Sequence, residues 1–325
     1  MSLFSVVIPY HNREAFLPRT LESVAAQTLR PLQLILVNNG STDTSERICR
    51  TFAETRNRPE FQVILLTDKI RGAAHARNTG LAAATGTWLS FFDSDDEMSP
   101  DFLQKMKAVF ERENCDVVAA ATRMVFEDGR EKVRSVRYTT SVADQILTGM
   151  LSTQSVTMRT DFARRIGGWN EGLETWDDWE WGIRTLLARP VLFWMKGEAF
   201  HRIHQHGDSL TGISFSSTYE QIKRAFATVS GLLENDKQVH RKACAALCLR
   251  KAILAGHLAR EKAAEAAREA LADSLSSAES RKLRFFCSLL YRYTCVGGKG
   301  AWLIAGLGLR FLYKRQAVCA DREKQ

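Results

Sequence analysis

Short apolar runs alternate with amphipathic stretches along the first half of the chain. Five of these runs carry no charge and are rich in Val, Ile, Leu, Phe or Ala, which is typical of strands buried on both faces of a sheet. Between them, apolar residues recur at helical spacing. This alternation predicts an α/β fold with a largely parallel sheet and helices on both faces. The expected strands are residues 4–8, 34–37, 63–66, 88–92 and 117–120.

Start signals mark two of the helices between these strands. Asn12 is a candidate N-cap for the first helix, because its side chain can accept a hydrogen bond from the first turn. Ser99 followed by Pro100 is a favourable start for the helix after the fourth strand. Two further helices are expected at residues 44–56 and 73–84.

The middle of the chain has a mixed pattern. Asp128 and Gly129 separate two apolar segments, residues 124–126 and 133–138, and predict a hairpin turn. Further strands are expected at residues 156–159, 191–195 and 199–203, and helices at residues 160–166 and 176–188.

The last third of the chain has a helical pattern only, so residues 1–215 and 216–325 are assigned to separate regions. From Tyr219 onward there are 20 Lys and Arg against 10 Asp and Glu, whereas the first 218 residues carry 25 against 27. The net charge of +8 therefore belongs to the tail. Helices are expected at residues 219–233, 237–257 and 261–272, and a late apolar segment at 302–312 precedes Lys314 and Arg315.

Two interpretations of this basic tail remain open. Its positive excess and its late apolar segment suit an interfacial helix held against anionic lipid headgroups. Alternatively, its Lys and Arg side chains form a solvated face while the apolar residues pack on the main domain. No nucleic-acid partner is expected, because no nucleic-acid motif accompanies the basic residues.

The cysteines point to a reducing compartment. There are seven of them, scattered and without a CxxC pair, which disfavours a disulfide framework or a zinc site. The N-terminus lacks a signal-peptide pattern, and no apolar run approaches the length that spans a bilayer. We therefore expect a cytoplasmic protein, with the cytoplasmic face of the membrane as a candidate peripheral contact.

Polar residues follow four of the expected strands, and ligands of open α/β sheets bind beyond those strand ends. After the fourth strand, Asp93 and Asp95 can face one point, because side chains two apart in an extended segment point the same way. Two like charges there need a cation or a proton between them. Alternatively, Asp95 and Asp96 only decorate a turn. The residues after the other three strands include Pro9, Tyr10, His11, Asn12, Asn38, Asn39, Asp43, Asp68, Arg71 and Gly72.

Together these motifs resemble those of the inverting family 2 glycosyltransferases. The resemblance rests on the order and spacing of several motifs between residues 4 and 210, and the C-terminal third is not covered. It implies a GT-A fold, which is Rossmann-like with a mostly parallel central sheet and helices on both faces, followed here by a helical C-terminal region. The matching segments are residues 4–12, 38–43, 72, 76–80, 93–96, 167–171, 177–180 and 202–204, ahead of Ser209.

The resemblance also implies a metal-assisted donor site. Asp93 and Asp95 match the family's DxD pair, with Asp95 the more direct ligand of Mg²⁺ or Mn²⁺ and His204 a further ligand. Asp96 is interpreted as structural. A zinc site at His201, His204 and His206 is disfavoured, because no cysteine cluster accompanies them. The implied donor-binding residues are Pro9, Tyr10, Asn12, Asn38, Asn39, Asp68, Gly72, Arg77, Asp93 and Ser94.

Two features of the implied donor site leave alternatives. The family more often has Asp where this chain has Asn38 or Asn39, and an amide both donates and accepts whereas a carboxylate only accepts, so the nucleotide preference is open. Asp43 either caps a helix or touches the ligand. Arg71 and Arg77 either approach the diphosphate or form surface ion pairs.

The implied catalytic base is Asp178, which matches the Asp of the family's Glu-Asp motif, with Asp177 in place of the Glu. Alternatively, both are first-turn acids favoured by a helix dipole. Trp176, Asp177 and Trp169 are expected on the acceptor side, although large aromatic residues more often belong to a core. Trp179 and Trp181 cannot share a face of one helix.

The sequence thus predicts an inverting glycosyltransferase. It would move a sugar from a nucleotide-diphosphate donor to a hydroxyl of a glycan or lipid-linked acceptor, in cell-surface polysaccharide or glycolipid biosynthesis. One alternative is a non-catalytic nucleotide-sugar-binding subunit. Another is a nucleotidyltransferase, which would need a Gly-rich basic loop after the first strand. A dinucleotide-dependent oxidoreductase is disfavoured, because no GxGxxG follows a strand.

Overall fold

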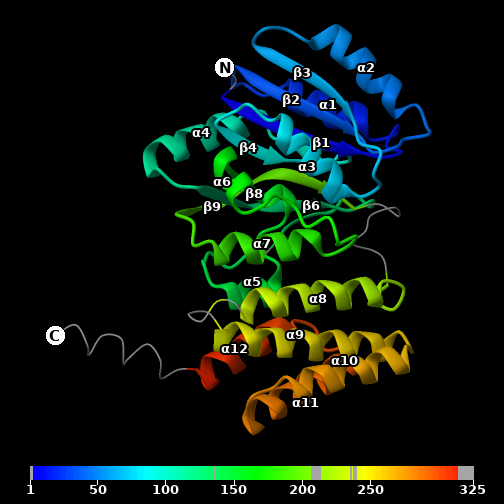
Figure 1. Ribbon diagram of the computed structural model, residues 1–325, viewed down its shortest axis with the longest axis vertical. Coiled ribbons are helices and arrows are strands. Elements are labelled where there is room, and N and C mark those ends of the chain that lie inside the picture. The colour runs from blue at the N-terminus through cyan, green and yellow to red at the C-terminus, as the bar shows by residue number, and fades with distance from the viewer. Residues whose placement is uncertain (1–2, 135, 206–213, 235, 237–239, 314–325) are drawn as a thin grey trace, which may run out of the picture. The chain divides into compact units, whose positions relative to one another are not determined.

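The computed structural model describes residues 3–134, 136–205, 214–234, 236 and 240–313. The chain forms two compact units (Figure 1). The first consists of residues 1–139 and 150–211, and the second of residues 140–149 and 212–325. His206, Ser209, the start of the helix expected at residue 237, and Lys314 with Arg315 lie outside the described residues.

The described part of the first unit contains a nine-stranded mixed sheet with the order β3-β2-β1-β4-β8-β6-β9-β5, and β7 pairs with β6. Its long pairings, β1 with β2, β2 with β3 and β6 with β9, are parallel. The expected α/β fold is therefore confirmed. The strands are β1 (Phe4–Tyr10), β2 (Leu32–Asn38), β3 (Phe61–Thr67), β4 (Trp88–Phe91), β5 (Glu97–Met98), β6 (Val117–Val125), β7 (Glu131–Val133), β8 (Val156–Arg159) and β9 (Leu192–His204).

Helices cover both faces of this sheet. Along β1, Phe4, Val6 and Ile8 point into a core cluster shared with one set of helices, whereas Val7 points to the opposite face. There the Cγ1 of Val7 would lie 2.3 Å from a Cβ at Gly80, so only a glycine lets that helix approach the strand. The helices of this unit are α1 (Leu17–Ala25), α2 (Ser45–Arg56), α3 (Ala73–Ala83), α4 (Phe102–Glu113), α6 (Thr160–Arg165) and α7 (Asp177–Leu187), with a 3-10 turn at Thr153–Ser155.

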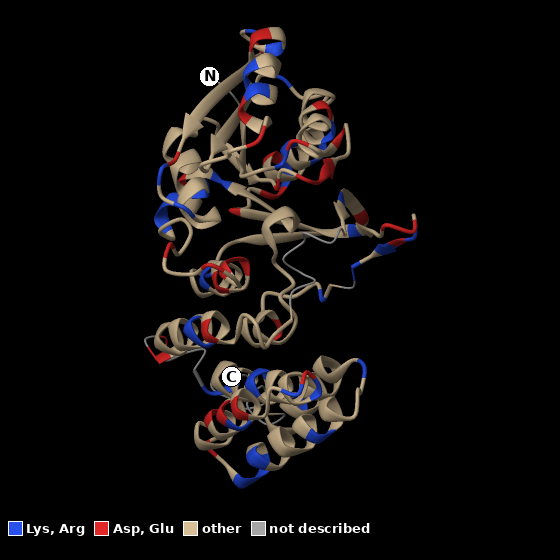
Figure 2. Cartoon of the chain, turned by 90° about the vertical axis from the view of Figure 1, so that its right-hand side faces the viewer, with Lys and Arg blue, Asp and Glu red and all other residues tan. Residues whose placement is uncertain are grey.

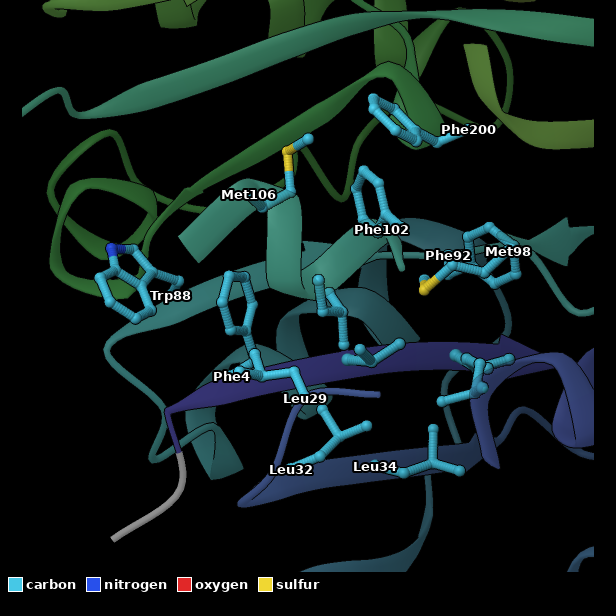
Figure 3. Packing of buried hydrophobic residues seen from close by; sticks show 14 of the residues in the cluster. Phe4, Leu29, Leu32, Leu34, Trp88, Phe92, Met98, Phe102, Met106 and Phe200 are labelled. Carbon is cyan, nitrogen blue, oxygen red and sulfur yellow. The ribbon is translucent and has the colours of Figure 1, made fainter. Parts of the chain in front are cut away.

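Aromatic packing joins α4 to the sheet. The ring centroid of Trp88 lies 5.1 Å from that of Phe4 and 5.4 Å from that of Phe110. Phe102 packs against Phe200 of β9 at 5.4 Å (Figure 3). Rings packed at these distances fix the helix relative to the strands and hold the strand ends in place.

The second unit is a bundle around α9 (His240–Arg260). Alanine, leucine and cysteine occur all round this helix, and most of its described side chains are buried, as expected for a helix that other helices cover on every side. Lys251, a buried cation of this helix, pairs with Asp273 at 2.8 Å. The surrounding helices are α5 (Val142–Thr148), α8 (Tyr219–Glu234), α10 (Ala264–Ser276), α11 (Arg281–Cys295) and α12 (Ala301–Leu312).

Blue segments, which mark Lys and Arg, occur on several helices of this bundle (Figure 2). In the described part of the chain, no helix combines the length and the apolar content that crossing a membrane requires.

Both predicted helix caps are wrong. Asn12 adopts a left-handed conformation with φ 50°, and its side-chain oxygen accepts a hydrogen bond from the Thr42 N–H at 2.8 Å. The hydroxyl of Ser99 donates to the Phe200 carbonyl at 2.6 Å. Because distant partners hold both side chains, α1 begins only at Leu17 and α4 only at Phe102.

Other differences concern the extent of elements. The two strands expected at residues 191–195 and 199–203 form one strand, β9, which passes through Gly197 at φ 82°. The hairpin at Asp128 and Gly129 is confirmed by the pairing of β6 with β7, but β7 has only three residues. No sequence pattern predicted α5 or α11. The late apolar segment expected at residues 302–312 forms α12.

Candidate active site

Hydrogen bonds join the carboxyl ends of the first three strands and the loops that follow them. The N–H of Asn39 donates to the Tyr10 carbonyl at 2.9 Å, and the N–H of Asp68 donates to the Asn38 carbonyl at 2.9 Å. Asn12 accepts from Thr42 in the loop after β2. These parallel strands end at the same edge of the sheet, so the expected convergence of their polar loops is confirmed.

The two asparagines at the end of β2, Asn38 in the strand and Asn39 directly after it, use the donor and the acceptor of their amides. Asn39 donates to the Ile70 carbonyl at 2.7 Å and accepts from the Gly72 N–H at 2.9 Å. Asn38 donates to Glu46 at 3.2 Å and accepts from the Ser41 N–H at 2.8 Å. A carboxylate at position 39 could not donate to Ile70, which gives a physical reason for the asparagine found where the family more often has Asp.

The loop after β3 is held from within and from α3. Asp68 accepts from the Ile70 N–H at 2.9 Å and from the Thr79 hydroxyl at 2.9 Å. Gly72 has φ 138°, which strains any residue with a side chain, and α3 begins immediately after it. The main chain at Gly72 is therefore the part of this residue that can face a ligand.

Tyr10 and Asp43, two residues considered as ligand contacts, bind or pack against other parts of the protein. The side chain of Tyr10 is 4% exposed and lies in the core cluster, so the expected donor contact by this side chain is corrected. Burial raises the pKa of Tyr10 well above its usual value. Asp43 accepts from the N–H groups of Ser45 and Glu14 at 2.9 and 3.1 Å, as a residue that organises a loop and a helix start.

The acids after β4 have different environments. Asp93 pairs with Arg77 at 3.0 Å and accepts from the Gln154 amide. Asp96 is 2% exposed and accepts from the His204 N–H at 2.9 Å and from Gln154 at 2.7 Å. Burial is the main cause that raises the pKa of Asp96 well above its usual value, with the charges of Asp95 and Asp93 adding to it. The structural interpretation of Asp96 is therefore confirmed.

The remaining residues of this loop face neighbouring elements. Asp95 lies 3.7 Å from the guanidinium of Arg13, and the carbonyl of the buried Ser94 accepts from the Thr20 hydroxyl at 3.1 Å. The Asp93 and Asp95 side chains keep 32% and 18% of their surface exposed, more than the buried Asp96. They are the acids of this loop that a ligand can reach.

The donor set can be compared with what a divalent cation needs. Among the residues that the structure describes, no three His, Cys, Asp or Glu side chains gather to hold a metal ion. The His204 ring instead bonds Glu97 at 2.7 Å. Mg²⁺ is usually bound by one or two carboxylates together with substrate phosphates, so Asp93 and Asp95 fit a cation that arrives with a diphosphate.

His201 is a core residue. It is 3% exposed, its ring packs against Phe92 and Phe102, and burial lowers its pKa to about 3. The imidazole of His201 is therefore part of the core packing.

Arg77 joins the acids after β4 to the acids at the start of α7. Its guanidinium donates to Asp177 at 2.7 Å and to Asp93 at 3.0 Å, and its carbon atom lies 4.3 Å above the ring of Trp169. The Arg77 side chain is only 8% exposed. Arg77 is thus a buried bridge and not a surface ion pair, and its contacts bring together two motifs that are far apart in the sequence.

Packing behind the site fixes the start of α7. Trp181 stacks on Trp169 at 4.6 Å with the ring planes 7° apart. Arg184 pairs with the buried Glu180 at 2.8 Å and donates to the Gly168 carbonyl at 2.7 Å. Asn78 of α3 exchanges two hydrogen bonds with the Trp169 main chain, at 2.9 and 2.8 Å. These contacts hold the first turn of α7 next to Arg77.

The tryptophans divide between core and site. Trp169 is 2% exposed, so the expected acceptor contact by its ring is corrected. Trp181 belongs to the same stack, while Trp179 packs edge-on against Trp176 at 5.2 Å. The prediction that Trp179 and Trp181 do not share a face is confirmed. Trp176 precedes α7 with φ 59° and is the one expected acceptor-side tryptophan that keeps partial exposure.

Asp178 is the acid whose environment suits proton transfer. Burial, and after it the negative charge of Asp177, raise the pKa of Asp178 to about 6, while the positive charges of Arg134 and Arg77 oppose the shift. Burial also raises the pKa of Asp177, against the positive charge of Arg77. A carboxylate with a pKa near neutrality is a better proton acceptor than an ordinary Asp.

A family model described as glycosyl transferase family 2 matches residues 5–167, half of the chain. The chain belongs to glycosyl transferase family 2. A relative named as a PGL/p-HBAD biosynthesis glycosyltransferase, from Mycobacterium bovis, is 32% identical over 197 residues, which is 58% of this chain and 72% of the relative. The resemblance inferred from the motifs is confirmed.

Other family 2 relatives are longer than the matched segment. The uncharacterized glycosyltransferase EpsJ of Bacillus subtilis is 32% identical over 131 residues, 40% of this chain and 37% of EpsJ. The glycosyltransferase GlyA of Streptococcus pneumoniae is 34% identical over 102 residues, which is 31% of this chain and only 14% of GlyA. The chain therefore spans less than half of the length of these two relatives.

Solved structures share the fold. S. aureus TarS 1–349 in complex with UDP has a TM-score of 0.65 at 18% identity, covering 96% of this chain and 92% of that one. The mannosyltransferase PcManGT from Pyrobaculum calidifontis, in complex with GDP-Man and Mn²⁺, has a TM-score of 0.59 at 17% identity, covering 97% and 88%. The likeness extends over both units and identifies the fold of this family 2 chain.

Proposed function

We propose that this chain is an inverting glycosyltransferase that moves a sugar from a nucleotide-diphosphate donor to a hydroxyl of a glycan or lipid-linked acceptor. The observation that carries the proposal is the Arg77 bridge, which couples Asp93 after β4 to Asp177 at the start of α7. A leaving-group side and a proton-accepting side thereby meet at one guanidinium. Family membership supports the same reaction class.

On the donor side, the strand-end loops would bind the nucleotide and its diphosphate. We assign the base and ribose to Pro9, Asn12, Asn38, Asn39 and Asp68, and the diphosphate to the segment from Gly72 and to Asp93, Ser94 and Asp95. A Mg²⁺ or Mn²⁺ ion on Asp95 and Asp93, with His204 as a further ligand, would offset the negative charge of the departing diphosphate. PcManGT, which was solved with GDP-Man and Mn²⁺, supports a metal-assisted donor.

On the acceptor side, Asp178 would act as the general base. Its carboxylate accepts the proton of the acceptor hydroxyl while the hydroxyl oxygen attacks C1 from the face opposite the diphosphate, which inverts the anomeric centre. Asp177, neutralised by Arg77, holds the first turn of α7 in place. Trp176, beside these acids, is the candidate residue to pack against the acceptor sugar.

The biological setting is proposed from the relatives and from the basic tail. The PGL/p-HBAD relative supports glycolipid or cell-surface polysaccharide biosynthesis. TarS with UDP and PcManGT with GDP-Man support a nucleotide-sugar partner without choosing the base. We further propose a cytoplasmic enzyme with peripheral contact to the membrane, motivated by the Lys and Arg excess after residue 218. We propose residues 1–215 as the catalytic region and residues 216–325 as the helical region, which packs with residues 140–149 in one unit.

The test is a donor panel of UDP-, GDP- and dTDP-sugars with Mg²⁺ or Mn²⁺, which measures nucleoside diphosphate release with and without acceptor extracts. Asp178→Asn should keep donor binding and lose transfer by at least about 10²-fold. Asp161→Asn is the matched control, because Asp161 is an exposed first-turn acid of α6. Normal turnover by Asp178→Asn would show that the base is elsewhere.

A second variant separates the enzyme from a non-catalytic binding subunit. Asp95→Ala should weaken metal-dependent donor binding, measured by calorimetry with a nucleotide sugar and Mn²⁺. A wild-type protein that binds the donor but releases no nucleoside diphosphate with any extract would favour the binding subunit over the transferase.

A further inference from the structure

Helices α11 and α12, together with the turn between them, carry most of the exposed large apolar side chains of the described residues. Among the described residues, six of the ten large hydrophobic side chains that are exposed lie between residues 285 and 311. Single exposed apolar residues are common on protein surfaces, but a concentration on two neighbouring helices marks an interaction surface. The six are Phe285, Leu289, Val296, Leu303, Leu307 and Phe311, with exposures from 41% to 84%.

Helical spacing places these residues in two stripes. Phe285 and Leu289 are four residues apart on α11, so their side chains lie on one face of that helix. Leu303, Leu307 and Phe311 have the same spacing on α12. Each stripe is thus a continuous exposed strip along its helix.

Phe286 makes the two stripes neighbours. Its ring centroid lies 5.9 Å from that of Phe285 and 6.2 Å from that of Phe311. Across the helix pair, a Cβ at Gly308 would lie 3.0 Å from the same ring, so the glycine lets α11 and α12 pack closely. We name the five residues Phe285, Leu289, Leu303, Leu307 and Phe311 the α11–α12 face.

The charged residues of the segment that carries this face have one sign. Residues 280–312 contain six Lys and Arg and no Asp or Glu, and all six cations are exposed. Arg281 and Arg292 lie one turn beyond the two ends of the α11 stripe, while Lys299 and Arg310 flank the α12 stripe. Their long side chains can extend from an apolar layer to charged headgroups. The nearest acid in the sequence is Glu279, whose carboxylate accepts a hydrogen bond from the Tyr313 hydroxyl at 2.7 Å.

We propose that the α11–α12 face docks on an anionic lipid surface, with its apolar stripes in the headgroup boundary and its cations on lipid phosphates. The segment that carries the apolar stripes supplies six cations and no acid, which suits a negatively charged bilayer surface, since binding there depends on both apolar area and charge. A second copy of the chain fits less well, because two such faces would bring like charges together. The inference deepens the peripheral contact proposed above and names the surface that makes it.

The test is cosedimentation of the full-length protein with vesicles. One set is pure phosphatidylcholine, and the other contains one third phosphatidylglycerol. We expect binding to the anionic vesicles only, and weaker binding in high salt because counterions screen the cations. Leu307→Ser with Phe311→Ser should lower this binding at least tenfold. The control is Val191→Ser, which removes an equally exposed apolar side chain from the first unit and should leave binding unchanged.

A charge variant, Arg292→Gln with Lys299→Gln and Arg310→Gln, provides a second measurement that leaves the apolar stripes intact. It should also lose binding to anionic vesicles. A wild-type protein that ignores these vesicles, or apolar and charge variants that both bind normally, would overturn the proposal. So would a wild-type dimer in light scattering that Leu307→Ser with Phe311→Ser converts to a monomer, since a second copy would then cover the face. Donor turnover measured without vesicles reports separately on the transferase.

Discussion

At the scale of single residues, the raised pKa of Asp178 lowers the stability of the folded protein at neutral pH and suits the residue to act as a general base. Its pKa in the folded protein is about 6, above the value of roughly 3.9 in an unfolded chain. The folded state therefore binds this proton more tightly than the unfolded state does. As the pH rises from the pKa of the unfolded state through that of the folded state, the free energy of unfolding falls. The loss reaches about 3 kcal/mol at neutral pH.

Asp178→Asn should consequently be more stable than the wild type while being inactive. We expect a higher melting temperature at neutral pH, and a difference that shrinks below about pH 4 where the carboxyl is protonated in both states. In the wild type, kcat/KM should rise with pH through about 6, because only the carboxylate can accept a proton. An acid limb that persists in Asp178→Asn would assign the titration to another group.

Arg77 is the residue whose loss should disturb both halves of the site. Arg77→Met leaves Asp93 and Asp177 without their shared cation, and breaking a buried pair typically costs about 3–5 kcal/mol. Arg77→Lys keeps the charge but not the planar fork that reaches two carboxylates, so kcat should fall more than stability. Urea unfolding and kcat report these effects separately.

Arg71→Met is the control for Arg77. This arginine is exposed and contacts only His11, at 2.9 Å, among the hydrogen bonds of the described residues. The Arg71→Met substitution should change the free energy of unfolding of the protein by less than about 0.5 kcal/mol. Equal destabilisation by Arg71→Met and Arg77→Met would contradict the bridging role.

At the scale of elements, the approach of α3 to β1 positions Arg77. Gly80 lies one turn after Arg77, and a Cβ there would meet the Val7 Cγ1 at 2.3 Å. Gly80→Ala should cost about 1–3 kcal/mol through overpacking, and it should lower kcat because α3 must shift. Gly231→Ala on α8, where nothing lies within 4 Å of the added Cβ, should instead stabilise by up to about 1 kcal/mol. A lower melting temperature for Gly80→Ala and a higher one for Gly231→Ala would support this account.

The same elements indicate how far the sequence could be interpreted. The first four strands were predictable because they are continuous apolar runs buried in a parallel sheet, and patterns of this kind depend little on distant partners. The helix caps at Asn12 and Ser99 were wrong because their side chains bond residues far along the chain. Local propensity cannot anticipate such partners.

The candidate site shows the same division. The strand-end acids and Asp178 carry motif signals, whereas Gln154, which bonds both Asp93 and Asp96, carries none. A lone Gln in a short 3-10 turn has no pattern of its own, and only the packing of that turn places it. Arg77 was named from its motif, but its bridge to Asp177 required the fold.

At the scale of the whole molecule, the two units are not successive stretches of the chain. Residues 140–149 leave the first unit, form α5 within the helical unit, and the chain then returns at residue 150. Val142, Ile146 and Leu147 of α5 are at most 6% exposed, and Arg250 of α9 donates to the Leu147 carbonyl at 3.1 Å. This segment was missed in the sequence because its cover comes from a helix about a hundred residues later.

A chain cut after residue 215 should therefore not behave as a complete domain. It would keep α5 but lose α9, which exposes three buried apolar side chains at a cost of ~1.5–3 kcal/mol each. We expect aggregation or binding of a hydrophobic dye, and a partial rescue by Ile146→Ser with Leu147→Ser in the same fragment. A fragment that stays monomeric, binds the donor and melts at the full-length temperature would instead establish residue 215 as a folding boundary, and α5 as independent of the helices that pack on it.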